Sequence, residues 1–328
     1  MPGDELTYQP GLVGEFATPA RRVVTIDSGP LSMLEALGAV DRVVAANDTD
    51  GGWSTLPATT RARIPLLPRR FPTLADILSH APDLVVAGDN EAFGDDALGT
   101  RAALARRGIR SFLLTEAALE DAPVITPATI HSTIDDTVVL GHVLGLADRA
   151  DTVTARWRTR IDAVAARARR NPPRRVFVLD MPRNDDVLTA GGAAVVTDLL
   201  RRVGGEPVTA DRPFTYGWVP WHQLATGARP HVLLVSDYGP LDVADKLDRL
   251  RARPEITAWR VGDLPAVVLP LRDTVEGANN IDALEHLATA FAALPNDTGL
   301  IDQDVEPTGQ DVEPTGQDVE PTDQPERP

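Results

Sequence analysis

One stretch near the N-terminus decides the fold class: residues 21–45 have the sequence RRVVTIDSGPLSMLEALGAVDRVVA. The apolar run at 22–27 predicts a buried strand, and 43–46 predicts a second one. Between them, residues 28–37 predict a helix, because Pro30 in the first turn loses no hydrogen bond that a helix needs. A strand, a helix and a strand in this order indicate parallel strands joined by a crossover helix.

The same alternation continues along the chain and then restarts after Asn171-Pro172-Pro173. Further strands are predicted at 82–87, 110–114, 175–179, 231–236 and 266–269, and helices at 74–79, 95–107, 193–203, 243–251 and 281–294. Between the two series, residues 148–169 predict a longer helix with apolar side chains at spacings of three and four. We therefore expect an α/β protein with two Rossmann-like lobes, each with a parallel sheet, joined by a single long interlobe helix.

These patterns divide the chain into five predicted segments. They are a flexible N-terminal arm at 1–20, an α/β lobe at 21–128, an interlobe helical segment at 129–170, a second α/β lobe at 171–295 and a tail at 296–328. The tail repeats DVEPTGQ with a period of seven residues and holds five Asp, four Glu and one Arg within 301–328. Such a sequence has little to bury, so we expect a disordered, solvating acidic tail.

Composition excludes several classes of protein. The net charge is −16 and the longest Arg-rich stretch, 167–175, is short, which argues against a nucleic-acid partner. The chain has no cysteine, which excludes disulfides, zinc–thiolate sites and cysteine nucleophiles. It has no run of about 20 apolar residues, so we expect no membrane-spanning segment. Residues 1–22 contain neither a signal peptide nor a lipidation cysteine, which indicates a cytoplasmic protein if the chain is the natural full length.

Sequence motifs for catalysis and for direct metal binding are absent. There is no G-x-G-x-x-G after a strand, no phosphate-binding P-loop, no G-x-S-x-G and no H-E-x-x-H. The six histidines are scattered, with no pair at metal-ligand spacing. We therefore predict no catalytic residue and no metal ligand supplied by the protein.

Four segments resemble one family, the ABC-importer substrate-binding proteins for ferric siderophores and cobalamin. They are residues 21–45, FPTLADILSHAPDLVVA at 71–87, GHVLGLADRA at 141–150 and DLLRRVGG at 198–205. The resemblance implies a ligand held in a cleft between the lobes and delivered to a membrane permease. It also implies an extracytoplasmic location, at the cell surface or in the periplasm.

The same family presents a Glu on each lobe to arginines of the permease. The matching positions here are Ala75 and Arg201, with Asp76 and Asp198 close by as possible substitutes. The resemblance therefore leaves docking to an ABC permease open.

Ligands of open α/β sheets bind at the carboxyl ends of the strands, and this rule selects candidate loops in both lobes. Arg69 stands three residues before P-x-L, where the resemblance implies the arginine of hydroxamate-siderophore binders, and Arg70 is its alternative. A guanidinium donates well to anionic chelate oxygens. Aromatic walls suit a bulky chelate. The remaining ligand-binding candidates are Trp53, Asn90, Glu91, Phe93, Arg183, Phe214, Tyr216, Trp218, Tyr238 and Arg272.

The expected function is binding of a ferric siderophore, with iron present only inside the chelate and no resident cofactor. Two alternatives stay open. The first is a cobalamin or haem binding protein, for which Tyr216 and Tyr238 are possible axial ligands. The second is a cytoplasmic member of the same fold that acts as an enzyme in small-molecule biosynthesis.

Overall fold

The structure is a computed structural model that describes residues 12–13, 17–47, 51–68, 70–119, 126–169 and 171–295. The predicted acidic tail at 296–328 and the candidate Arg69 lie outside the described residues. Part of the predicted arm is a strand, β1 (Leu12–Val13), which pairs antiparallel with the sheet of the first lobe. The predicted segment boundaries stay predictions.

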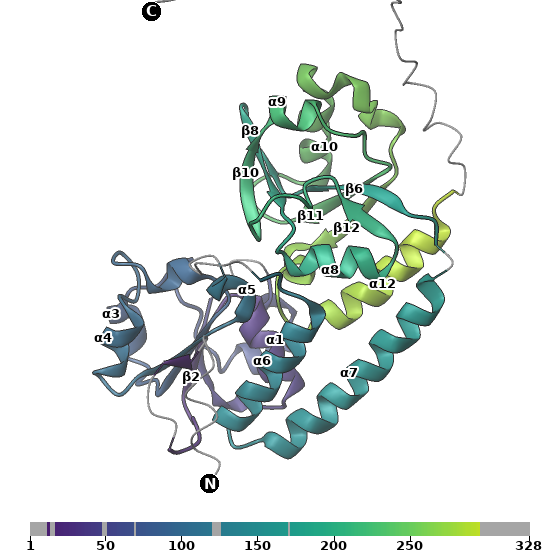
Figure 1. The fold of residues 1–328 in the computed structure, drawn as a ribbon. Coiled ribbons are helices and arrows are strands. Elements are labelled where there is room, and N and C mark those ends of the chain that lie inside the picture. Colours follow the sequence, from purple (N-terminus) through teal and green to yellow (C-terminus); the bar gives the residue numbers. More distant parts are fainter. Residues whose placement is uncertain are drawn as a thin grey trace, which may run out of the picture. The chain divides into compact units, whose positions relative to one another are not determined.

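The first lobe is built on a five-stranded sheet of order β1-β5-β4-β2-β3 (Figure 1). Its other strands are β2 (Val23–Ile26), β3 (Val43–Ala46), β4 (Leu84–Ala87) and β5 (Arg110–Leu113), and these four are parallel. β2, β4 and β5 are buried along their whole length, and β2 and β4 have the nearly continuous apolar sequences expected of such strands, whereas β5 begins with buried Arg110 and Ser111. One hydrophobic cluster covers each face of the sheet.

Short helices connect these strands. They are α1 (Ser28–Ala36), α2 (Ala58–Arg61), α3 (Leu74–Leu78), α4 (Arg101–Ala105) and α5 (Thr115–Ala118), with 3-10 turns η2 (Val40–Arg42), η3 (Trp53–Thr55) and η4 (Asn90–Phe93). The predicted helix at 95–107 is wrong over its first half. Gly99 has a φ of 76°, which ends any helical run there. Thr100 then starts α4 by accepting a hydrogen bond from the Ala103 amide at 3.2 Å.

Two helices connect the lobes, α6 (Ile130–Val143) and α7 (Ala147–Ala168). Gly145, with a φ of 66°, makes the turn between them. A side chain at Gly141 would lie 2.4 Å from the Ala150 side chain, so the two helices meet closely at this turn. The 22-residue α7 is the predicted long helix, and it packs against α6 and against α12 (Asn280–Ala293), the last of the described helices (Figure 1).

The second lobe has a four-stranded parallel sheet of order β12-β11-β6-β9. The strands are β6 (Arg174–Leu179), β9 (Gly205–Pro207), β11 (Val232–Asp237) and β12 (Ala266–Pro270). Helices α8 (Val195–Arg202), α9 (Trp221–Ala225), α10 (Val243–Arg251), α11 (Leu271–Thr274) and α12 (Asn280–Ala293) and turns η5 (Pro254–Trp259) and η6 (Val261–Asp263) complete it. The predicted alternation of strands and helices is confirmed in both lobes.

A small antiparallel sheet of order β10-β8-β7 also belongs to the second lobe, and the sequence pattern did not reveal it. Its strands are β7 (Met181–Pro182), β8 (Asp186–Ala190) and β10 (Tyr216–Pro220). The segment 214–221, which contains the candidates Phe214, Tyr216 and Trp218, is therefore mostly strand. Tyr216 and Trp218 lie two residues apart on β10, so they share one face of this sheet.

Candidate functional site

In the first lobe, three polar residues brace the ends of neighbouring strands. The Asp27 amide donates to Asn47 Oδ1 at 2.6 Å, and Asn47 Nδ2 donates to the Arg70 carbonyl at 2.7 Å. Asp27 has a φ of 73°, a conformation that costs a non-glycine residue about 1–3 kcal/mol. Such strain is concentrated at functional sites. Sequence reasoning selected the loops that contain Asp27 and Asn47, but did not single out either residue.

Arg70 is the described arginine of the predicted pair, and it forms an ion pair with Asp89 at 3.0 Å. Its guanidinium also lies 4.8 Å from the centre of the Phe71 ring. Burial lowers the pKa of Arg70, but the carboxylates of Asp89, Asp27 and Glu91 outweigh it and leave that pKa raised. The side chain is 60% exposed, so it is charged and able to change partner.

The other first-lobe candidates divide between surface and core. Glu91 is exposed and Asn90 half-buried on η4, where the Glu91 amide donates to Asp89 Oδ1 at 2.9 Å. Phe93 packs against a core cluster of the first lobe. Trp53 packs against the other core cluster, and its Nε1 donates to the Ile64 carbonyl at 3.2 Å.

In the second lobe, a buried polar cluster lies at the ends of β6 and β11. The Tyr238 hydroxyl donates to Asp180 Oδ1, and Asp180 is only 1% exposed. Lys246, fully buried on α10, donates from Nζ to the Ser236 carbonyl at 2.6 Å and lies 4.3 Å from the centre of the Tyr238 ring. Burial raises the pKa of Asp180 and lowers that of Lys246, and each group opposes the shift of the other.

Sequence reasoning missed Asp180 and Lys246, although a signal for Lys246 was present. It is the chain's only lysine and lies among apolar Val243, Leu247 and Leu250 at helical spacing. A charged residue on the apolar face of a helix indicates a buried partner. Asp180 follows β6, where the strand-end rule selects it only as a member of a loop.

Five more predicted residues lie around the small antiparallel sheet and α11. The Arg183 guanidinium stacks 3.3 Å from the centre of the exposed Trp218 ring. The Tyr216 hydroxyl donates to the Thr274 carbonyl at 2.9 Å. Phe214 is partly buried against a core cluster, and Arg272 lies 3.6 Å from Asp273.

Electrostatics connects the strand ends of the two lobes. The positive charge of Arg70, in the first lobe, acts to lower the pKa of both Asp180 and Tyr238 in the second. The structure therefore brings Arg70, Asp180 and Tyr238 within range of one another. Of these three residues, Arg70 is exposed and Tyr238 half-buried, so they can present a guanidinium and one aromatic ring to a small ligand, whereas Asp180 is buried.

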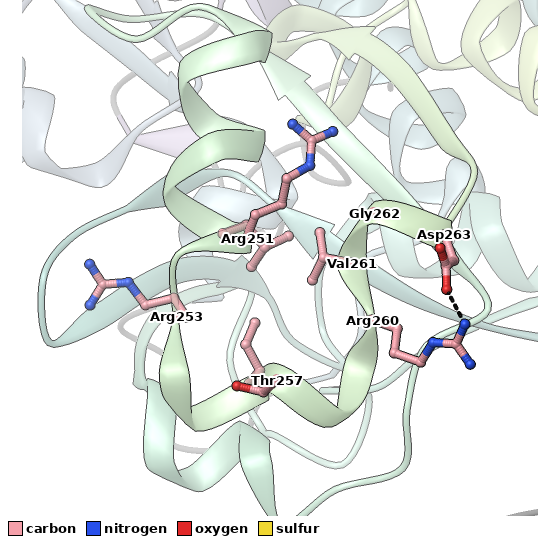
Figure 2. A pocket seen from close by; sticks show the side chains of 9 residues that line it. Arg251, Arg253, Thr257, Arg260, Val261, Gly262 and Asp263 are labelled. Atoms are coloured by element: carbon pink, nitrogen blue, oxygen red, sulfur yellow. Dashed lines mark ion pairs between the residues drawn. The ribbon is translucent and has the colours of Figure 1, made fainter.

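Two hollows lie elsewhere. One, of about 190 Å³, lies between the end of α10 and η6. Figure 2 shows the guanidinium groups of Arg251, Arg253 and Arg260 pointing in different directions, with Arg260 paired to Asp263 at 2.7 Å, so they do not converge on a ligand. The other, of about 280 Å³, lies along α6 beside Asp136.

The acidic residues considered for permease docking are engaged within the protein. Asp76 Oδ2 accepts from the Thr73 amide at 2.7 Å, in a capping box that starts α3. Asp198 Oδ2 accepts from the Ile130 amide at 2.9 Å and from Arg202 Nε at 2.8 Å. Both carboxylates therefore stabilise helix ends and are poorly available to a partner.

Neither metal clusters nor membrane helices occur in the described part of the chain. No three His, Cys, Asp or Glu residues among those described gather closely enough to hold a metal ion. No described helix is both long enough and apolar enough to cross a bilayer.

A sequence profile described as periplasmic binding protein matches residues 23–263. No curated protein sequence matches the chain. Among solved structures, a periplasmic binding protein from Veillonella parvula has a TM-score of 0.71 at 19% identity, covering 83% of this chain and 91% of that one.

Two further solved structures are similar. An ABC-type Fe³⁺-hydroxamate transport system from Saccharomonospora viridis has a TM-score of 0.66 at 21% identity, covering 87% and 100% of the two chains. A periplasmic heme-binding protein from Roseiflexus has a TM-score of 0.66 at 23% identity, covering 83% and 98%. These TM-scores establish a shared fold.

Proposed function

Because this chain belongs to the periplasmic binding protein family, we propose that it binds a ferric siderophore between its two lobes for delivery to an ABC importer. Family membership makes it a solute-binding protein and not an enzyme, which removes the biosynthetic alternative. The finer assignment concerns which ligand it binds. An extracytoplasmic location is part of the proposal.

The observation that carries the proposal is the state of the two described tyrosines. Haem iron needs an axial ligand such as Tyr or His. The Tyr216 and Tyr238 hydroxyls both donate to protein oxygens, and burial together with the Asp180 carboxylate raises the pKa of Tyr238. A tyrosinate is therefore disfavoured at either position. None of the six histidines directly follows a parallel strand.

A ferric siderophore needs no ligand from the protein, because the chelate fills the iron coordination sphere. It needs hydrogen-bond donors and aromatic contact instead. The exposed Arg70 and the stacked Arg183–Trp218 pair supply both. The similarity to an Fe³⁺-hydroxamate transport structure supports the same ligand class.

The test is a titration of the full chain, followed by tryptophan fluorescence, with a ferric hydroxamate, a ferric catecholate, haem and cyanocobalamin. We expect saturable binding of one ferric siderophore class. Arg70→Ala should weaken it about tenfold or more, the cost of a lost charge-assisted hydrogen bond. Arg106→Ala, on the exposed end of α4, is the matched control and should bind like the parent.

Tyr238→Phe separates the haem alternative. It should leave siderophore affinity within a few-fold, since the ring is kept. Haem binding with a Soret band that changes in Tyr238→Phe, and no binding of either ferric siderophore, would overturn the proposal in favour of haem. Saturable binding of cobalamin alone would overturn it in favour of cobalamin.

A further inference from the structure

Two buried glutamates from different lobes, Glu116 and Glu276, each accept a hydrogen bond from the other's backbone amide, and we call this pair the Glu116–Glu276 clasp. Glu116, on α5 of the first lobe, donates from its amide to Glu276 Oε2 at 2.6 Å. Glu276, between α11 and α12 of the second lobe, donates from its amide to Glu116 Oε2 at 2.8 Å. Their side chains are 6% and 3% exposed. The two residues are 160 positions apart, so this reciprocal pair is a direct link between the lobes.

The clasp reaches a third element. Glu116 Oε1 accepts from the Val195 amide at 2.8 Å, at the start of α8, where the N-cap Ala194 has no side chain to serve as cap. Both oxygens of Glu116 therefore accept hydrogen bonds from the second lobe. A carboxylate that accepts two amide hydrogen bonds, one of them at a helix N-terminus, is stabilised in its charged form.

The backbone around the clasp is closely packed. A side chain at Gly29 would lie 2.1 Å from the Glu276 carbonyl oxygen, and one at Gly277 would lie 2.8 Å from Gly29 Cα. Ser32 Oγ, on α1, accepts from the Ala278 amide at 2.9 Å. α1 of the first lobe and residues 276–278 of the second therefore meet in direct contact.

The charged groups with the largest effects on the pKa of Glu276 are acidic. Burial raises the pKa of the Glu276 carboxyl well above its usual range, and Asp136, Glu116 and Asp135 raise it further. The negative charge of Glu116 also raises the pKa of the buried Tyr216 phenol, after burial itself. Among the described residues, no cation is one of the groups with the largest effects on Glu276, and its Oε1 has no hydrogen-bond partner. With Glu116 charged, Glu276 is the member that holds a proton.

We propose that the Glu116–Glu276 clasp is a proton-dependent latch: with a proton on Glu276 it holds the two lobes together at this junction, and loss of that proton releases them. Ionised Glu276 would place a second negative charge, buried and without a counter-charge, beside Glu116 and Asp136. Opening the junction hydrates that charge. The closed state is therefore favoured at low pH and weakened as pH rises.

The absence of cysteine allows a direct test with two spin labels. Ala102 on α4 and Ala225 on α9 are exposed, one in each lobe, and are replaced by Cys for labelling. Distances between the labels are measured by pulsed electron resonance from pH 5 to pH 9 on the full chain. We expect one narrow distribution at pH 5 and a growing longer component toward pH 9.

Two variants distinguish a latch from general loosening. Glu276→Gln copies the protonated side chain and should keep the narrow distribution at every pH. Glu116→Gln loses one of the two acceptors that Val195 and Glu276 need, and should show the longer component even at pH 5. Circular dichroism of each labelled protein checks that it is folded.

A pH response in Glu276→Gln equal to that of the parent would overturn the proposal, and so would a parent distribution that ignores pH. If Glu116→Gln fails to fold, the parent and Glu276→Gln still decide the matter. None of these measurements uses a ligand, so the outcome is independent of the proposed siderophore.

Discussion

The two lobes hold the charged groups at their strand ends in different ways. In the first lobe, the side chains of the Arg70–Asp89 pair are 60% and 22% exposed, and the pair lies on the surface. In the second lobe, Asp180 and Lys246 are 1% and 0% exposed and both interact with the half-buried Tyr238. The Arg70–Asp89 pair in the first lobe is therefore free to exchange its ion-pair partner for a ligand. The Asp180–Lys246 pair in the second lobe is a fixed part of the core.

The largest expected effect comes from removing the buried cation. Lys246→Met should lower the free energy of unfolding by about 3–5 kcal/mol, because Asp180 stays buried without its counter-charge. Arg70→Met is the matched change in the first lobe and should cost less than about 1 kcal/mol. Urea denaturation of both variants measures the difference. Equal losses of unfolding free energy in the two variants would show that the buried and the exposed charged pairs do not differ in their contribution to stability.

Asp136 is a buried carboxylate with no ion-pair partner among the described residues, so it can be compared with the Asp180–Lys246 pair. Burial raises the pKa of Asp136 to about 7, from an ordinary value of about 3.9. Between these values the folded protein binds more protons than the unfolded chain. The free energy of unfolding should therefore fall as pH rises from about 4 to about 7, by up to about 1.4 kcal/mol per pH unit.

Asp136→Asn is the control for this pH dependence. Asp136 accepts from the Thr115 amide at 2.7 Å and from its hydroxyl at 2.8 Å. Asparagine keeps both contacts if the hydroxyl reverses and accepts. The slope for Asp136→Asn should be shallower than that of the parent between pH 4 and 7. Identical slopes would mean that Asp136 is ionised in the folded protein throughout.

Local sequence patterns predicted the elements well where burial alone decides them. The strand at 43–46 and the helix at 243–251 agree with β3 and α10 in both limits. The pattern failed at 95–107, where Gly99 interrupts an otherwise helical composition, and at 214–221, where an edge strand has no clean alternation. Both failures depend on backbone geometry that composition does not encode.

The site was harder to predict than the fold. The strand-end rule selects loops, but a loop position does not say whether a side chain points to solvent or to the core. Trp53 and Phe93 pack inward, whereas Arg70 and Trp218 are exposed. The Glu116–Glu276 clasp joins residues 160 positions apart, and no local pattern predicts such a contact.

A smaller effect tests how closely the two lobes meet. Gly29→Ala places a methyl group 2.1 Å from the Glu276 carbonyl oxygen, which belongs to the backbone of the other lobe. The junction must shift, at an expected cost of about 1–3 kcal/mol. Gly262→Ala, with open space around it, should change the free energy of unfolding by less than about 1 kcal/mol. Thermal denaturation compares the two, and a neutral Gly29→Ala would show that the junction yields easily.

The smallest effect is expected at Arg183, which is charged and exposed although it belongs to the second lobe. Its guanidinium lies 3.3 Å from the centre of the Trp218 ring, and an exposed cation–π contact contributes about 0.5–1 kcal/mol. Arg183→Ala should therefore behave like the Arg70 variant and unlike Lys246→Met, while Arg183→Lys keeps part of the contact. Urea denaturation measures the stability, and Trp218 emission reports the loss of stacking. Because Arg183 is exposed, a cost above about 2 kcal/mol would mean that burial does not explain the different stability costs of removing these cations.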